Sequence, residues 1–110
     1  MSNKQIVDNF SVSTPDTVEI AYTAPADKSV VIESFTAANN SGVNAAYSCY
    51  IKSAAGALQP QVKDKVVVWG RSDLGIGAVN QIIPPSGTIR IEATATAAIY
   101  FTISGREVSV

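Results

Sequence analysis

The stretch Gln81–Thr94, QIIPPSGTIRIEAT, decides the fold class of this chain. Two prolines and a Ser-Gly step are typical of a tight turn, because proline fixes φ and glycine tolerates positive φ. From residue 88 onward every second residue is apolar, which predicts a strand with one buried and one exposed face. We expect Ile89, Ile91 and Ala93 to point into a core.

The same organisation, a turn followed by a strand, recurs along the chain. Eight short runs with turn residues between them are predicted as strands, at residues 17–23, 30–38, 43–52, 65–71, 78–83, 88–94, 99–104 and 106–110. This pattern, without a convincing helix, predicts an all-β fold, an antiparallel β-sandwich or jelly roll, with a closed barrel as the main alternative. At 110 residues we expect one β-sandwich domain at residues 13–110, preceded by an N-terminal arm or first strand at residues 1–12.

The buried face of each predicted strand follows from its alternation. In the run 43–52, one face is expected to form core: Val43, Ala45, Tyr47, Cys49 and Ile51. In the run 99–104, the expected core residues are Ile99, Phe101 and Ile103, and in the run 17–23 a shared face is expected for Val18, Ile20 and Tyr22. The run 30–38 has apolar residues on both faces, so its buried face stays open.

Several connections are predicted from turn residues. The tetrad NNSG at 39–42 favours a hairpin connection, and residues 53–64 favour a loop with room for a short helical turn. Gly105 is expected to end one strand before the last strand, in which Val108 and Val110 form an apolar face.

The composition limits the possible partners. Charged residues make up 15% of the chain, below the roughly 25% typical of soluble proteins. Either a partner covers part of the surface, or small polar residues simply replace charges. The net charge of −1 and the scattered cations do not form a basic patch, so we expect no nucleic-acid partner.

No run of 18 apolar residues suggests a membrane span, and the first residues show no signal-peptide core. We therefore expect synthesis in a cytoplasm and no membrane partner.

The residue inventory argues against an enzyme. The chain has no histidine and one cysteine, which excludes Ser-His-Asp and Cys-His arrangements and the usual zinc sites. We expect no catalytic residue, metal ligand or cofactor. Cys49 lies among apolar neighbours and is expected to be buried and inert. The Gly75-Ile-Gly77 step resembles a phosphate-binding loop only weakly, because no third glycine or Lys-Ser pair follows.

Trp69, the only tryptophan, has two interpretations. It caps the core at a strand end, or it anchors an interface or a sugar-stacking platform. Arg71 and Asp73 would then supply a polar rim.

Four motifs carry a resemblance to small structural proteins of tailed phages. They are a PA-x-K-S turn at Pro25–Ser29, an N-S-G turn at Asn40–Gly42, a P-x-G-x-I-R-I strand entry at Pro85–Ile91, and a closing TISG-x-E-V strand at Thr102–Val108. Between residues 20 and 108 the chain is similar to capsid decoration proteins, also called cement or staple proteins, of short-tailed phages.

That resemblance implies a virion structural protein on the capsid surface. The implied partners are the major capsid protein and further copies of the chain, as a dimer or trimer. The residues expected at the interface are Ile6, Phe10, Trp69, Arg71, Leu74 and Ile76. A tail or fibre position is an alternative within the same resemblance. The rival from another class is a carbohydrate-binding module, in which Trp69 would stack on sugars together with Tyr22, Tyr50 or Tyr100.

Overall fold

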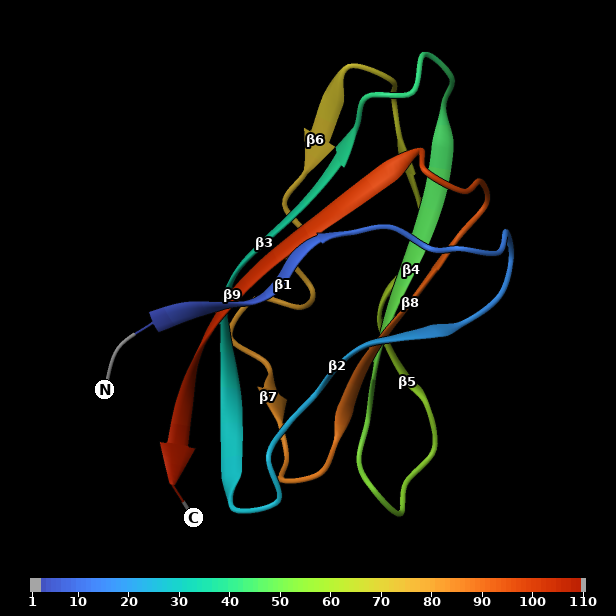
Figure 1. The fold of residues 1–110 in the computed structure, drawn as a ribbon. Helices are drawn as coiled ribbons and strands as arrows, with labels where there is room; N and C mark the ends of the chain where they lie inside the picture. Colours follow the sequence, from blue (N-terminus) through green and yellow to red (C-terminus); the bar gives the residue numbers. More distant parts are fainter. Residues whose placement is uncertain (1–2, 110) are drawn as a thin grey trace.

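The alternating runs of the sequence fold into strands of two antiparallel sheets (Figure 1). The computed structural model describes residues 3–109, which hold nine strands and no helix. One sheet has the order β1-β9-β3-β6, with β7 also paired to β3, and the other has the order β2-β8-β4-β5. The strands are β1 (Asn3–Phe10), β2 (Glu19–Thr23), β3 (Lys28–Asn39), β4 (Ala45–Lys52), β5 (Gln59–Val67), β6 (Arg71–Asp73), β7 (Ile82–Ile83), β8 (Thr88–Ala93) and β9 (Ile99–Ser109).

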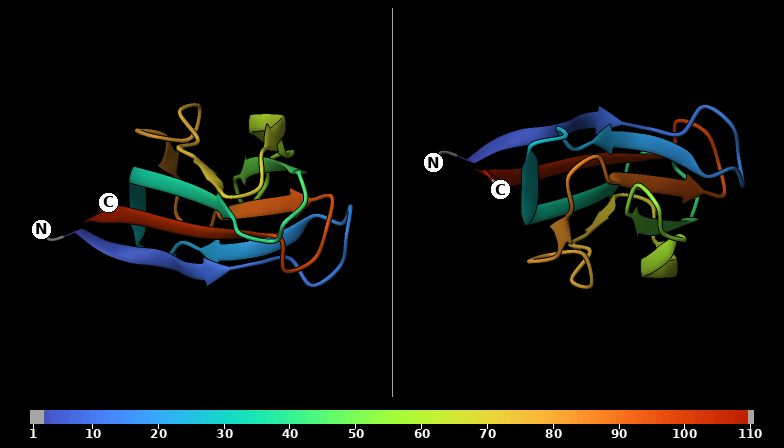
Figure 2. Two further views of the ribbon diagram at one scale, coloured as in Figure 1. Left: turned by 90° about the horizontal axis from the view of Figure 1, so that it is seen from above. Right: turned by 90° about the horizontal axis from the view of Figure 1, so that it is seen from below.

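The strand order is that of a jelly roll. The first four strands alternate between the sheets, and the last two, β8 and β9, return to lie in the middle of each. Figure 2 shows the two layers end on, with β1 and β2 together along one side and the loops around β6 and β7 along the other. The predicted antiparallel sandwich or jelly roll is confirmed. The nine strands differ from the eight predicted runs because β1 is additional, residues 65–71 fall on both β5 and β6, and the runs 99–104 and 106–110 form the single strand β9. The sheets do not close into a barrel.

The core lies between the sheets and is centred on three aromatic rings. Phe35 on β3, Tyr47 on β4 and Phe101 on β9 have ring centroids 5.2 to 6.1 Å apart. The predicted core faces of β8 and β9 are confirmed, and so is that of β4 from Ala45 onward. Val43 lies before β4 and is exposed instead.

A β-bulge in β3 explains why its sequence shows no single buried face. Ile32 pairs with Gly105 and Ser34 with Ser104, so Glu33 is an extra residue with no register partner on β9. Before the bulge Val30 and Ile32 are buried, and after it the buried set is Phe35, Ala37 and Asn39. The inserted residue shifts the period-two alternation by one.

The two proline-marked turns of the sequence lie side by side. Ala24 donates its N–H to the carbonyl of Gly87 at 2.8 Å, and Ser86 donates to Pro25 at 3.2 Å. This contact follows from the pairing of β2 with β8, which brings Thr23 opposite Thr88.

Two expectations for the first half of the chain are wrong. Ile20 does not share a buried face with Tyr22, because a register shift falls between them, and Ile20 is half exposed. The 39–42 segment is not a hairpin connection, since it leads from β3 in one sheet to β4 in the other. The side-chain amide of Asn39 fixes this crossing, because it donates to the carbonyls of Val43 and Val67 at 2.8 Å each.

In the second half of the chain several predicted boundaries are wrong. The predicted loop 53–64 ends at residue 58 and the predicted strand 65–71 stops at Val67, because residues 59–67 form the single strand β5. Pro60 and two register shifts interrupt the period of β5. Of the predicted run 78–83, only β7 is a strand, and residues 78–80 form a turn.

Gly105 does not end a strand, since β9 continues through it to Ser109. A Cβ at Gly105 would lie 2.9 Å from the carbonyl oxygen of Val31, so the glycine permits close packing opposite the bulge. Val110 lies outside the described residues.

Candidate functional site

The most unusual surface of the molecule is the segment from Val66 to Ile76. It carries five exposed apolar side chains, Val66, Val68, Trp69, Leu74 and Ile76, of which Ile76 is 83% and Trp69 59% exposed. The segment joins the end of β5 in one sheet to β6 in the other. Trp69 therefore does not cap the core, and the interpretation as a structural cap is wrong.

Backbone bonds hold the turn that presents Trp69. The N–H of Trp69 donates to the side-chain oxygen of Asn44 at 3.2 Å, and the N–H of Gly70 donates to the carbonyl of Asn39 at 2.7 Å. Gly70 has φ of +77°, a conformation that L side chains rarely adopt. The exposed indole is thus carried by an ordered turn that is tied to the crossing between β3 and β4.

The Leu74–Gly77 loop is anchored by Asp73. The Asp73 carboxylate accepts a hydrogen bond from the Tyr47 hydroxyl at 2.5 Å and another from the Gly75 N–H at 3.1 Å. Burial and the Asp73 carboxylate both raise the pKa of Tyr47, so the phenol stays protonated and remains a donor. This carboxylate links the core of one sheet to the edge of the other.

The Gly-Ile-Gly step is a packing device. A Cβ on Gly75 would lie 2.2 Å from the Phe35 ring, and one on Gly77 would lie 2.1 Å from the carbonyl oxygen of Gln61. Both glycines allow the loop to lie directly on the core and on β5, while Leu74 before them and Ile76 between them are exposed. These close approaches account for both glycines. The Gly-Ile-Gly step follows the strand β6 and leads into a turn, whereas a phosphate-binding loop lies at the start of a helix.

A groove runs between β5 and β6. Its larger part, about 390 Å³, is lined by Lys65, Val66, Val67, Val68, Arg71, Ser72 and Asp73. A second hollow of about 220 Å³ shares Lys65 and Asp73 with it and extends along Gln61, Val62, Ile76 and Gly77. The shared residues make the two hollows neighbours along the open edge between the sheets.

The groove is lined by two cations, Lys65 and Arg71, and one acid, Asp73. Lys65 lies 3.9 Å from Asp73, whose other carboxylate oxygen already accepts two hydrogen bonds. Within residues 3–109, no ion pair involves Arg71, and its side chain is exposed. The groove therefore keeps a positive charge beside apolar walls.

The six residues predicted at the interface fall into two groups. Trp69, Arg71, Leu74 and Ile76 lie within one exposed segment of eight residues, at one edge of the sandwich. Ile6 and Phe10 lie on β1, at the other edge of the same sheet, and pack partly buried against the core. Sequence reasoning missed Lys65 and Val68, and the apolar run of residues 66–69 is the signal that could have indicated an exposed strand end.

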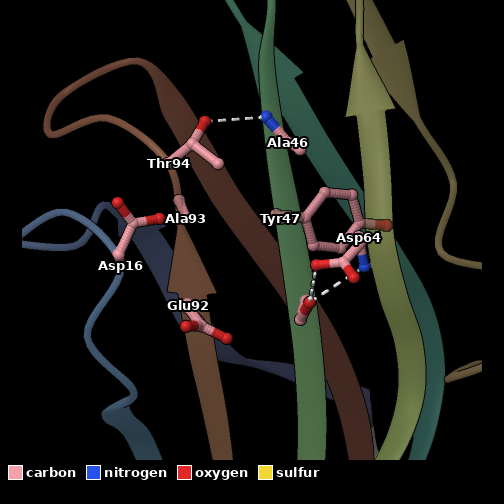
Figure 3. A pocket seen from close by; sticks show the side chains of 8 residues that line it. Asp16, Ala46, Tyr47, Asp64, Glu92, Ala93 and Thr94 are labelled. Atoms are coloured by element: carbon pink, nitrogen blue, oxygen red, sulfur yellow. Dashed lines mark hydrogen bonds between the residues drawn. The ribbon is translucent and has the colours of Figure 1, made fainter.

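A smaller polar hollow of about 40 Å³ lies on the outer face of β4 and β8 (Figure 3). Asp16, Asp64 and Glu92 point toward it, and Ser48 accepts the Asp64 N–H at 2.9 Å. Glu92 accepts a hydrogen bond from the Tyr50 hydroxyl at 2.9 Å. These bonds hold neighbouring strands together. In the described part of the chain, no group of three histidine, cysteine or acidic side chains is arranged to hold a metal ion.

Cys49 is buried between the sheets, as predicted. Burial raises the pKa of its thiol to about 12, so the thiolate is scarce at neutral pH. The predicted burial of the thiol is confirmed.

The aromatic residues of the carbohydrate hypothesis are dispersed. Tyr50 is buried beneath Lys63 and bonded to Glu92, and Tyr22 is partly buried on β2. Tyr100 lies on β9, in the other sheet from both. Trp69 is the one strongly exposed aromatic of this set, so the row of exposed rings which that hypothesis requires is not formed.

Residues 3–109 contain no helix that is long and apolar enough to cross a membrane.

Comparison with known proteins identifies the fold. No protein-family model and no curated protein matches the chain. Among solved structures, this chain is similar to a protein chain in the structure of infectious bursal disease virus Gx strain, with a TM-score of 0.55 and 9% identity. It is also similar to a protein chain in the crystal structure of the infectious bursal disease virus VP2 subviral particle, with a TM-score of 0.51 and 10% identity.

Each match covers 98% of this chain and 32% of the viral chain, so this chain spans about a third of the length of those it resembles. At these identities the similarity shows the fold alone: an all-β sandwich of a kind that also occurs in virus particles.

Proposed function

We propose that the protein is a non-enzymatic virion structural protein, which binds the outer surface of an assembled phage capsid and stabilises it. The observation that carries this proposal is the exposed apolar segment 66–76, held in place by the Asp73 anchor on a chain with few charges. Exposed apolar side chains gathered on an ordered surface are typical of protein contacts. The jelly-roll fold and the resemblance of the turn motifs to phage decoration proteins support the same role.

Such a protein stabilises a shell by mass action. Because it binds the assembled lattice and not the dissociated subunits, the stability of the shell rises with occupancy. Self-association as a dimer or trimer would add avidity, since several copies then bind neighbouring lattice points together. The partner in this proposal is the major capsid protein, and the location is the capsid surface.

Co-sedimentation with capsids tests the proposal. Purified protein is mixed with mature phage shells that lack it, and with immature shells as a control. We expect saturable binding to mature shells and a raised resistance of the loaded shells to heat or chelator. No binding to either kind of shell contradicts the decoration role and favours the alternative, a tail- or fibre-associated virion protein.

Substitution of Trp69 tests the surface. Trp69→Ala is expected to change the free energy of unfolding by less than about 0.5 kcal/mol, because the side chain is exposed. Shell binding should weaken about tenfold or more, since aromatic anchors dominate interfaces. Ile20→Ala, at an exposed apolar position on β2, is the control and should bind as the wild type does. Loss of glycan affinity in Trp69→Ala, with shell binding intact, would instead support a carbohydrate-binding module.

A further inference from the structure

The groove between β5 and β6 consists of two adjacent hollows. They measure about 390 and 220 Å³ and share Lys65 and Asp73 in their walls. Apolar residues, among them Val68 and the exposed Ile76, line the groove together with the cations Lys65 and Arg71. An occupant that fills both hollows would need apolar side chains on either side of a polar group.

The charge of the groove identifies that polar group. Asp73 already accepts hydrogen bonds from Tyr47 and Gly75, and no carboxylate of the described residues pairs with Arg71. A guanidinium in this position binds a carboxylate well, because two parallel N–H groups match its two oxygens. The groove is thus complementary to an acidic residue flanked by apolar ones.

Other occupants fit these charges less well. Two copies of the chain joined by the same face would place the cations Lys65 and Arg71 of both grooves in one interface, and Asp73, the one acid that lines the groove, already accepts hydrogen bonds from Tyr47 and Gly75. An anionic membrane attracts clusters of four or more basic residues. Residues 61–77 contain only three cations against two acids.

β5 also resists simple strand addition. Pro60, two register shifts and the positive φ of Asp64 make its edge irregular, which are features that protect edge strands from pairing. Recognition at this edge therefore depends on side chains, and the pairing of Arg71 with an acid would provide specificity.

We propose that this groove binds an extended segment of the partner protein in which an aspartate or glutamate is flanked by aliphatic residues. The inference rests on the proposed function and names the chemistry of the contact through which the chain attaches to its shell. Arg71 would pair with the carboxylate, and Ile76 and Val68 would contact the flanking aliphatic side chains.

A displayed library of random ten-residue peptides, selected on the immobilised full chain, tests the proposal. We expect the enriched peptides to share an acidic residue between aliphatic ones. Fluorescence anisotropy of labelled consensus peptide then gives the affinity for wild type and variants. Arg71→Glu should weaken binding tenfold or more, whereas Lys28→Glu, which makes the same charge change at the far end of β3, should stay within twofold.

A second matched pair tests the apolar walls. Ile76→Ser should weaken binding at least threefold, and Ile82→Ser, at an exposed isoleucine that does not line the groove, should not. A library without enriched peptides, a consensus without an acid, or equal binding by Arg71→Glu each overturns the proposal. Dimers in sedimentation velocity that Arg71→Glu abolishes would also overturn it, by showing that a second copy occupies the groove.

The shell assay separates this inference from the proposed function. If the wild type and Arg71→Glu bind mature shells equally, the groove is not the contact, and the decoration role stands. If the acidic peptides bind and no shell does, the groove assignment stands for another partner and the decoration role fails.

Discussion

At the scale of single residues, Asp73 determines where the exposed segment lies. Its carboxylate joins the Tyr47 hydroxyl in the core to the N–H of Gly75 in the loop. The sequence indicated Asp73 only as a polar neighbour of Trp69, because its partner Tyr47 is 26 residues away in the chain. A hydrogen bond between the two sheets cannot be predicted from local periodicity.

The first prediction concerns this bond. Asp73→Ala leaves the Tyr47 hydroxyl buried without an acceptor, and we expect a loss of about 1–3 kcal/mol in the free energy of unfolding. Tyr47→Phe should cost less, about 0.5–1.5 kcal/mol, because the Asp73 side chain is 22% exposed and can turn to water. Urea unfolding measures both. A larger loss in Tyr47→Phe than in Asp73→Ala would contradict the assigned role of the carboxylate.

At the scale of elements, the sequence predicted strands well where the alternation is regular. β8 and the core faces of β4 and β9 follow from period two alone. The sequence failed at β5, because Pro60 and two register shifts break the period, and at the connection 39–42, because a turn sequence does not reveal which sheet the next strand joins. The prediction also failed at Gly105, where close packing rather than a strand end requires glycine.

The second prediction follows from the bulge in β3. Glu33 has no register partner on β9, so its deletion joins Ile32 to Ser34 and yields a regular ladder with the same residues buried. The deletion also removes the ion pair of Glu33 with Arg106, which is partly exposed. Deletion of Thr36, which pairs with Thr102, instead inverts the faces of Ala37 and Asn39. We expect the Glu33 deletion to keep one cooperative thermal transition in circular dichroism, and the Thr36 deletion to lose it. Similar melting of both variants would contradict the conclusion that the bulge at Glu33 causes the change of buried face in β3.

At the scale of the whole molecule, all four sheet edges are short or irregular. β1, β2 and β5 carry register shifts, and β6 has three residues. Such edges discourage strand pairing between molecules, so association must use side chains on the surface. Four residues that the sequence predicted at an interface, Trp69, Arg71, Leu74 and Ile76, are exposed in the segment 66–76, and their contact with a partner stays a prediction. The sequence could not predict the groove, which exists only because the jelly roll places β5 opposite β6.

The last prediction tests whether the two sheets share one core. The Phe101 ring packs edge-on against both Phe35 in its own sheet and Tyr47 in the opposite sheet. Phe101→Ala should therefore cost about 3–5 kcal/mol, a large part of the 5–15 kcal/mol typical of a domain. Because one core stabilises both layers, amide exchange should accelerate to a similar degree in β3 and β4. Faster exchange confined to the sheet of β3 and β9 would show that the two layers unfold separately. In that case the hydrogen bonds of Asp73 would not be enough to couple the exposed segment 66–76 to both sheets.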